Sequence, residues 1–341
     1  MKLVTLFAVI LLCASLAHAQ QQPPREWVAE WPETDFQKAA VAFSEIRSGG
    51  PPKDGIRSID EPAFARLENG TASGWASELS PNEAVIALDV EGDARAYPLR
   101  ILIWHEIVND IVGGVPVAVT YCPLCNSALT FRRSLGGRVL DFGTTGKLRN
   151  SDLVMYDRQT ESWWQQFTGE AIVGELTGAE LELVPSRLVS FGQFATEFPN
   201  GRVLVPADPQ AREYGRNPYL RYDAAGQTPF LYSGDLPDGI DPMERVVAIE
   251  TSPGIFEAWA LSLIREQREI RRDDLVLRWR PGQSSALDRE TVATGRDVGT
   301  VSVSRVVNGE TEPVAFDTPF AFAFHAFRPD GPIHVGDQQD R

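Results

Sequence analysis

The chain of 341 residues contains 32 basic and 47 acidic residues, which give a formal net charge of −15 at pH 7. A charge of that sign argues against nucleic acid or an anionic membrane as the partner, and no other partner is indicated. With 43% hydrophobic residues and three cysteines, the chain can bury large cores, which excludes the class of small secreted proteins held together by disulfides.

Residues 1–19 are predicted to be a signal peptide. Lys2 provides a positive start, and residues 3–12 form an apolar core too short to span a bilayer. The small residues at 17 and 19 fit a cleavage site, so the mature chain is expected to begin at Gln20. Since no later segment is long and apolar enough for a membrane helix, we expect a periplasmic or secreted protein without a membrane span.

The mature chain is predicted to begin with an extended and helical segment over residues 20–75, including a short helix over 35–48. A first β-rich lobe follows over residues 76–206. Its strands are expected where β-branched and aromatic residues stand between turn residues, at 84–90, 115–121, 129–133, 139–142, 153–156, 171–176 and 181–184.

One longer helix is predicted in this lobe, over residues 99–112. Ile103, Ile107 and Ile111 recur every four residues and would form one apolar face. The glycines at 113 and 114 would end the helix.

The chain length suits two lobes rather than one small domain. Residues 207–241 are rich in Pro, Gly, Asp and Tyr and are predicted to connect the lobes. The second lobe is expected over residues 242–341, with a helix over 256–268 and an alternating strand over 320–324.

The two lobes are predicted to be degenerate repeats. Residues 117–138 align with 275–296 without a gap, and further matches upstream occur in the same order. The fold class is therefore predicted as mainly β (α+β), with two degenerate β-rich repeats and a few short helices.

Cys122 and Cys125 are the only cysteines outside the predicted signal, and they form a Cys-Pro-Leu-Cys motif. In the repeat alignment they fall on Arg280 and Gln283, so the second lobe builds the same loop without thiols. This contrast favours a functional role for the pair over a purely structural one.

A metal site is the first hypothesis, with Cys122, Cys125 and His105 as ligands. Thiolates and imidazole suit copper or zinc, and His105 is expected in the element just before the strand that carries Cys122. Met155 or Asp152 is a possible fourth ligand. Alternatively, His105 only forms a hydrogen bond to the backbone or to Glu106 at a lobe surface.

Two other hypotheses stay open. Cys122 and Cys125 are redox candidates for thiol–disulfide exchange, because a strand followed by such a motif is similar to thioredoxin-like proteins, where a helix start lowers the thiol pKa. The pair could also be a structural disulfide in a non-catalytic binding module, with Trp163, Trp164 and Phe167 lining a surface.

Whether the protein is an enzyme is left open. The loop over 143–148 lacks the phosphate-binding pattern, so no nucleotide cofactor is predicted.

Several motifs resemble one known family. They are Trp-His-Glu-Ile-Val-Asn-Asp at 104–110, Tyr-Cys-Pro-Leu-Cys-Asn-Ser-Ala at 121–128, Ser-Trp-Trp-Gln-Gln at 162–166 and Tyr-Gly-Arg-Asn-Pro-Tyr at 214–219. Together they resemble the DUF3179 family, a domain of unknown function. The resemblance implies an exported or membrane-associated bacterial protein and no assigned activity.

Overall fold

The computed structural model describes residues 22–336. The predicted signal peptide over residues 1–19 and the expected start at Gln20 lie outside the described residues. Strands make up 40% of the structure and helices 14%, so the protein is mainly β with short helices, as predicted. Within residues 22–336, no helix combines the length and the hydropathy that a membrane crossing requires.

Five larger sheets form a β-propeller-like arrangement. The first has the strand order β14 (Ser186–Ser190), β3 (Ala84–Val90), β4 (Asp93–Pro98), β15 (Arg202–Val205) and β2 (Ala63–Arg66). The second has the order β1 (Ile46–Ser48), β10 (Phe142–Arg149), β11 (Asp152–Asp157), β12 (Trp163–Gln165) and β13 (Glu170–Val173). The third consists of β5 (Ile107–Val112), β6 (Val115–Cys122) and β7 (Ser127–Arg132).

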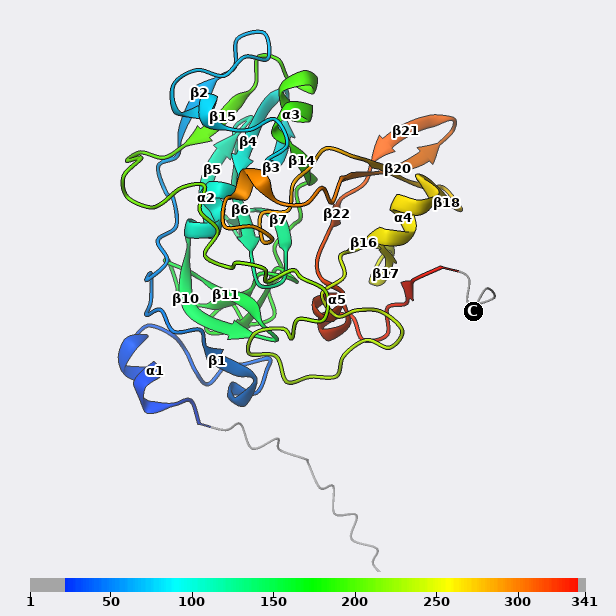
Figure 1. Ribbon diagram of the computed structural model, residues 1–341. Helices are drawn as coiled ribbons and strands as arrows, with labels where there is room; N and C mark the ends of the chain where they lie inside the picture. The colour runs from blue at the N-terminus through cyan, green and yellow to red at the C-terminus, as the bar shows by residue number, and fades with distance from the viewer. Residues whose placement is uncertain (1–21, 337–341) are drawn as a thin grey trace, which may run out of the picture.

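The remaining sheets come mostly from the end of the chain and lie together on one side of the molecule (Figure 1). One has the order β22 (Phe316–Asp317), β16 (Val246–Ser252), β17 (Ile255–Ala260) and β23 (Ile333–His334). The other has the order β18 (Glu269–Arg272), β19 (Leu275–Arg280), β20 (Thr300–Val307) and β21 (Glu310–Pro313). A small ribbon pairs β8 (Ser134–Leu135) with β9 (Arg138–Val139).

All helices of the described residues are short. The α-helices are α1 (Arg25–Glu30), α2 (Leu99–His105), α3 (Phe191–Glu197), α4 (Leu261–Gln267) and α5 (Ala321–Phe327). Single 3₁₀ turns occur at η1 (Phe43–Glu45), η2 (Gly74–Glu78) and η3 (Val292–Thr294).

The helix predicted over residues 99–112 is wrong in its second half. It ends at His105, because Glu106 adopts a left-handed conformation with φ of 59°. Residues 107–112 form strand β5 instead, and Ile111 of the supposed apolar face is 56% exposed. Spacing of four residues fits both a helix face and alternate positions of a strand, so the isoleucines did not distinguish them.

Three other predictions are corrected. The helix expected over 35–48 is only the short turn η1, and the helix expected over 256–268 begins as strand β17 and becomes α4 at Leu261. The strand expected over 320–324 is helix α5, which also contains His325. This run is buried on every side, so its alternation carried no information about which face is solvent.

Most of the predicted strands are confirmed. Residues 84–90, 115–121, 129–133 and 153–156 correspond to β3, β6, β7 and β11. The predicted strand at 139–142 is divided between β9 and the start of β10, and the one at 171–176 is shortened to β13. The segment 181–184 is not a strand and makes one isolated bridge, from Leu183 to Phe131.

The same order of elements occurs twice. A hairpin, a seven-residue helix, a left-handed residue and a second hairpin form β3–β4–α2–β5–β6 and again β16–β17–α4–β18–β19. The left-handed residues are Glu106, with φ of 59°, and Arg268, with φ of 65°. The Glu106 carbonyl accepts a hydrogen bond from the Tyr121 N–H of β6 at 2.8 Å, and the Arg268 carbonyl accepts one from the Trp279 N–H of β19 at 3.0 Å.

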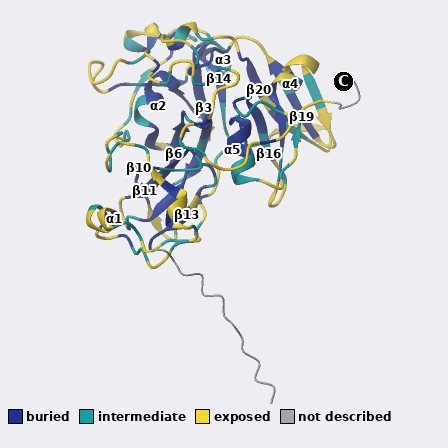
Figure 2. Cartoon of the chain, turned by 60° about the horizontal axis from the view of Figure 1, so that its bottom comes forward, coloured by how far each residue is buried: buried dark blue, intermediate teal, exposed yellow. Residues whose placement is uncertain are grey.

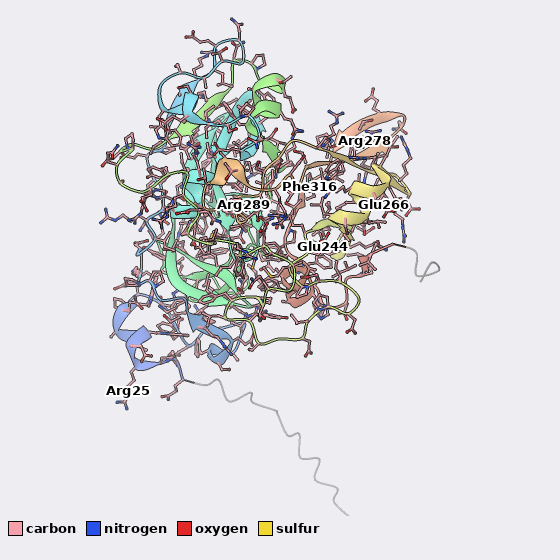
Figure 3. The ribbon with its side chains drawn as sticks, in the orientation of Figure 1. Arg25, Glu244, Glu266, Arg278, Arg289 and Phe316 are labelled. Carbon is pink, nitrogen blue, oxygen red and sulfur yellow. The ribbon has the colours of Figure 1, made fainter. Side chains whose placement is uncertain are left out.

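The largest core cluster contains residues of both predicted lobes. It contains Cys122 and Cys125 of the first lobe together with Leu287, Phe320 and Phe322 of the second lobe. Figure 2 shows the buried strands at the centre and the exposed segments around them. Strand β22, marked by Phe316 in Figure 3, contacts β7 and β14. Residues 206–245, between β15 and β16, contain no helix or strand, which agrees with a connector, while the exact lobe boundaries stay a prediction.

Candidate functional site

The thiols lie on the tight turn between β6 and β7. Cys122 is the last residue of β6 and pairs with Ser127, the first of β7. Pro123 restricts the backbone after Cys122, and Asn126 takes a left-handed conformation with φ of 51°, which asparagine tolerates well. The Cys125 N–H donates to the Cys122 carbonyl at 3.3 Å. This turn brings the two thiols together.

Asp152 completes a group of three potential metal ligands. The two sulfurs and one carboxylate oxygen of Asp152 all lie within 4.8 Å of one another, and all three residues are buried. Asp152 is the first residue of β11. The three residues therefore come from the β6–β7 turn and from a strand of a different sheet. The group could hold a metal ion.

Unpartnered oxygen atoms surround this group. Asp152 Oδ2 accepts hydrogen bonds from Gln165 Nε2 at 2.6 Å and from Phe167 N–H at 3.0 Å. Asp152 Oδ1, Gln165 Oε1 and Gln166 Oε1 are buried and have no hydrogen-bond partner among the described residues. Gln166 reaches Thr120, two residues before Cys122 on β6. A buried acceptor without a donor costs free energy, and a cation is the partner that would satisfy such oxygens.

Burial dominates the electrostatics of the site. It raises the pKa of the Cys122 thiol and holds the pKa of Cys125 well above its usual range. It also raises the pKa of Asp152 to about 7. Burial, followed by the charge of Asp152, raises the pKa of Glu106 to about 8. Each shift reflects an anion that lacks compensating charge, and a bound metal ion would supply that charge.

The structure does not provide the feature on which thiol–disulfide exchange was predicted. The motif lies in a hairpin turn, so no helix start lowers the thiol pKa. Both thiols are free and buried, and their raised pKa values disfavour the thiolate that attacks a disulfide. The structure also shows no disulfide between Cys122 and Cys125.

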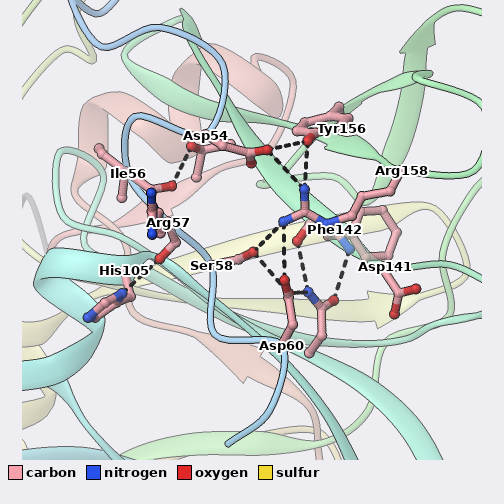
Figure 4. A network of polar contacts seen from close by, with 12 residues as sticks. Asp54, Ile56, Arg57, Ser58, Asp60, His105, Asp141, Phe142, Tyr156 and Arg158 are labelled. Atoms are coloured by element: carbon pink, nitrogen blue, oxygen red, sulfur yellow. Dashed lines mark hydrogen bonds and ion pairs between the residues drawn. The ribbon is translucent and has the colours of Figure 1, made fainter. Parts of the chain in front are cut away.

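His105 is not brought to the thiols. Its Nδ1 lies 2.7 Å from the Arg57 carbonyl and its Nε2 lies 2.8 Å from the Tyr214 hydroxyl. Figure 4 shows His105 against the segment 54–60, which Arg158 links to β11 through Asp54. Both ring nitrogens are therefore engaged, which corresponds to the alternative of a backbone hydrogen bond. The structure groups the two cysteines with Asp152, which the sequence offered as a possible ligand, and not with His105.

The other side chains considered from the sequence are core residues. Met155 is buried in the cluster that contains both cysteines, and it is not part of the ligand group of Cys122, Cys125 and Asp152. Trp163 and Trp164 are fully buried, and Phe167 is buried as well. A binding surface formed by Trp163 and Trp164 is therefore wrong, whereas Phe167 lines a separate cavity.

The second half of the chain fixes the thiol-bearing turn. The Ser127 hydroxyl and the Ala128 N–H donate to Asp317 at 2.6 and 2.9 Å. The Phe320 N–H donates to the Cys125 carbonyl at 2.9 Å. These bonds fix the turn at Cys125 and at the start of β7. The positions of the two thiols therefore depend on residues almost 200 positions further along the chain.

A cleft with a volume of about 310 Å³ lies beside the site. Glu106 and Leu124 contribute to its wall, and Tyr219, Tyr222 and Phe230 form an aromatic side. Leu124 stands between the two cysteines in the sequence, so the cleft adjoins the ligand group. Sequence reasoning missed Glu106 as a site residue. The available signal was an acid within an otherwise apolar segment that the structure buries.

These features define a mainly β protein with a buried group of two thiols and one carboxylate next to a cleft. The chain belongs to the family described as "Protein of unknown function (DUF3179)", whose family model matches residues 53–331. The matched region includes every residue of the ligand group and of its supporting contacts, and the resemblance noted in the sequence is confirmed. No curated protein and no solved structure gives a significant match.

Proposed function

We propose that this protein binds a divalent transition metal ion through the thiolates of Cys122 and Cys125 and the carboxylate of Asp152. The observation that carries the proposal is the convergence of three buried ligand atoms within 4.8 Å. Asp152 Oδ1 supports it, because no hydrogen-bond donor from outside this group of three residues reaches that oxygen, and a buried carboxylate oxygen usually has such a partner.

The donor set favours zinc over copper. Cu(I) selects soft sulfur ligands, whereas zinc accepts thiolate and carboxylate together. Three protein ligands are also the usual number for a zinc ion that keeps a further position for water or substrate. The cleft next to Leu124 would give access to that position.

The proposal extends to where the protein acts. The pattern of residues 1–19 supports export and cleavage before Gln20. The metal measurement is therefore best made on protein from a periplasmic fraction, where Gln20 is the expected first residue.

The test is zinc content and zinc affinity of gently purified protein, by mass spectrometry of metals and competition with a chelator. We expect about one zinc ion per chain. Cys122→Ser, Cys125→Ser and Asp152→Asn are each expected to lower zinc affinity by at least about 100-fold, since even outer contacts of a metal contribute tenfold or more.

His105→Asn is the matched control. It changes the histidine that the sequence favoured and keeps a group able to donate to the Arg57 carbonyl, so zinc affinity should stay the same. Metal-free wild-type protein, or zinc that is lost in His105→Asn and kept in Asp152→Asn, contradicts the proposed ligand set.

We infer further that the two halves are degenerate copies of one unit. The repeated element order supports this, and so do two buried serines at matching positions, each of which donates to an aspartate elsewhere in the chain. Ser127 donates to Asp317 at 2.6 Å, and Ser285 donates to Asp223 at 2.5 Å. Only the first copy carries thiols, so the metal site belongs to that copy and the second supplies support.

A further inference from the structure

The cleft beside the metal site contains one acidic side chain that nothing in the described protein satisfies. Glu106 lines the cleft and is only 7% exposed. Burial, followed by the like charge of Asp152, raises the pKa of its carboxyl group, and Cys122 and Tyr219 also lie within reach of its charge. A carboxylate kept in this position without a donor carries a large cost, which a ligand could remove.

The backbone at Glu106 does not explain the choice of glutamate. Its left-handed conformation recurs at Arg268 in the second half, where the side chain is entirely different. The fold therefore requires the left-handed backbone at this position, but it does not require a glutamate side chain there. In the first half the acid faces a cleft, and this points to a role for the carboxylate itself.

The charge of the cleft selects its ligand. Glu106 and Lys147 are the only charged residues that line it, and the Lys147 ammonium is already paired with Glu30 at 2.9 Å and lies 5.2 Å from the centre of the Trp31 ring. Asp152 and Cys122, which interact electrostatically with Glu106, are also acids. An ammonium group would stabilise the Glu106 carboxylate, whose proton burial otherwise retains, whereas an anionic ligand would oppose its ionisation.

The lining of the cleft also includes three aromatic residues. Tyr219 and Tyr222 meet at 6.5 Å between ring centres in an edge-to-face arrangement, and Phe230 is the third, which remains 46% exposed. Aromatic faces attract ammonium groups. The volume of about 310 Å³ lies at the lower end of the range of small-molecule pockets, about 300–1,000 Å³.

We propose that this cleft binds a small organic amine, with its ammonium group at Glu106 and its apolar body against Tyr219, Tyr222 and Phe230. The inference deepens the proposed metal function, on which it rests for the access that the cleft gives to the metal. The contacts to the amine come from residues outside the ligand set, so the two proposals can fail separately.

The test is calorimetric titration of zinc-loaded protein with 2-phenylethylamine, and with 2-phenylethanol and 3-phenylpropionate as neutral and anionic analogues. We expect the amine to bind at least about tenfold more tightly than either analogue, the effect of one charge-assisted hydrogen bond in a buried site. Glu106→Gln should remove that preference. Phe230→Ala, at an exposed position that does not endanger folding, should weaken amine binding.

Glu250→Gln is the control, since Glu250 is an exposed acid outside the cleft, and it should bind the amine like the wild type. Equal affinity for amine and alcohol, or unchanged amine affinity in both Glu106→Gln and Phe230→Ala, overturns the inference. Zinc content is measured on the same samples. If the protein contains zinc and shows no preference for the amine, the amine site is refuted and the metal site is not. If the protein contains no zinc and still shows a preference that depends on Glu106, the amine site is supported and the metal site is refuted.

Discussion

Asp152 and Glu106 are the residues whose chemistry depends most on their surroundings. In water their pKa values would be near 3.8 and 4.5, and in the folded protein they are about 7 and about 8. Both shifts arise first from burial, which removes the water that stabilises a carboxylate. The metal-free folded protein therefore holds protons between about pH 4 and pH 8 that the unfolded chain has released.

A pH-dependent stability follows at this scale. A folded state that binds more protons than the unfolded state loses stability as the pH rises. Metal-free protein should thus lose on the order of a few kcal/mol of unfolding free energy between pH 5 and pH 8. Urea denaturation in the presence of a chelator measures this change.

Glu106→Gln provides the comparison, because glutamine has the same shape and no proton to release. Its loss of unfolding free energy over the same pH range should be clearly smaller, with the remainder due to Asp152. Stability that rises with pH would show that these carboxyl groups are not the cause, and an identical slope in the variant would show that Glu106 does not contribute.

At the scale of elements, the β6–β7 turn is held by the segment that begins with β22. Asp317 is buried and accepts hydrogen bonds from Ser127, Ala128 and the Thr318 N–H, the last at 2.8 Å. A short two-residue strand is an unusual place for so many buried bonds, and the position of Cys125 depends on it through the Phe320 N–H.

Removal of this anchor should therefore affect stability and metal binding together. Asp317→Ala leaves three buried donors without an acceptor and should cost about 3 kcal/mol of unfolding free energy. It should also weaken zinc binding about tenfold, the effect of losing an outer support of a metal ligand. Thermal unfolding of metal-free protein and chelator competition separate the two effects.

Asp330→Ala is the matched control, because Asp330 is exposed, and neither quantity should change. If Asp317→Ala lowers stability and leaves zinc affinity intact, the turn holds its ligands without help from the second half.

At the scale of the whole molecule, the two predicted lobes share their main core. Phe320 and Phe322 are fully buried in the same cluster as Cys122 and Cys125. A fragment that ends at residue 206 would expose the apolar surface that these rings cover, at a cost of about 2 kcal/mol or more for each large side chain. The lobes should consequently be one folding unit.

We expect residues 22–336 to unfold in a single transition, with equal midpoints for tryptophan fluorescence and far-ultraviolet circular dichroism. A fragment of residues 22–206 should lack dispersed amide signals in its proton–nitrogen NMR spectrum. Two separate transitions, or a well-folded fragment, would show instead that the lobes are independent domains.

Much of this protein is determined locally by its sequence. The mainly β class and strands such as β3 and β6 follow from runs of β-branched residues, which favour extended backbone whatever lies around them. The pairing of Cys122 with Cys125 follows from their spacing, and Asp152 was within reach as a possible ligand because its strand was recognised. The family motifs are likewise a property of the sequence.

Only the tertiary structure decided which side chains meet. The helix that begins at Leu99 ends at His105. The carbonyl of the next residue, the left-handed Glu106, accepts a hydrogen bond from the Tyr121 N–H of another strand, and no local pattern contains that bond. The same turn directs His105 to the Arg57 carbonyl. The raised pKa values, the cleft and the Asp317 anchor all depend on burial by distant segments, and burial is a property of packing in three dimensions.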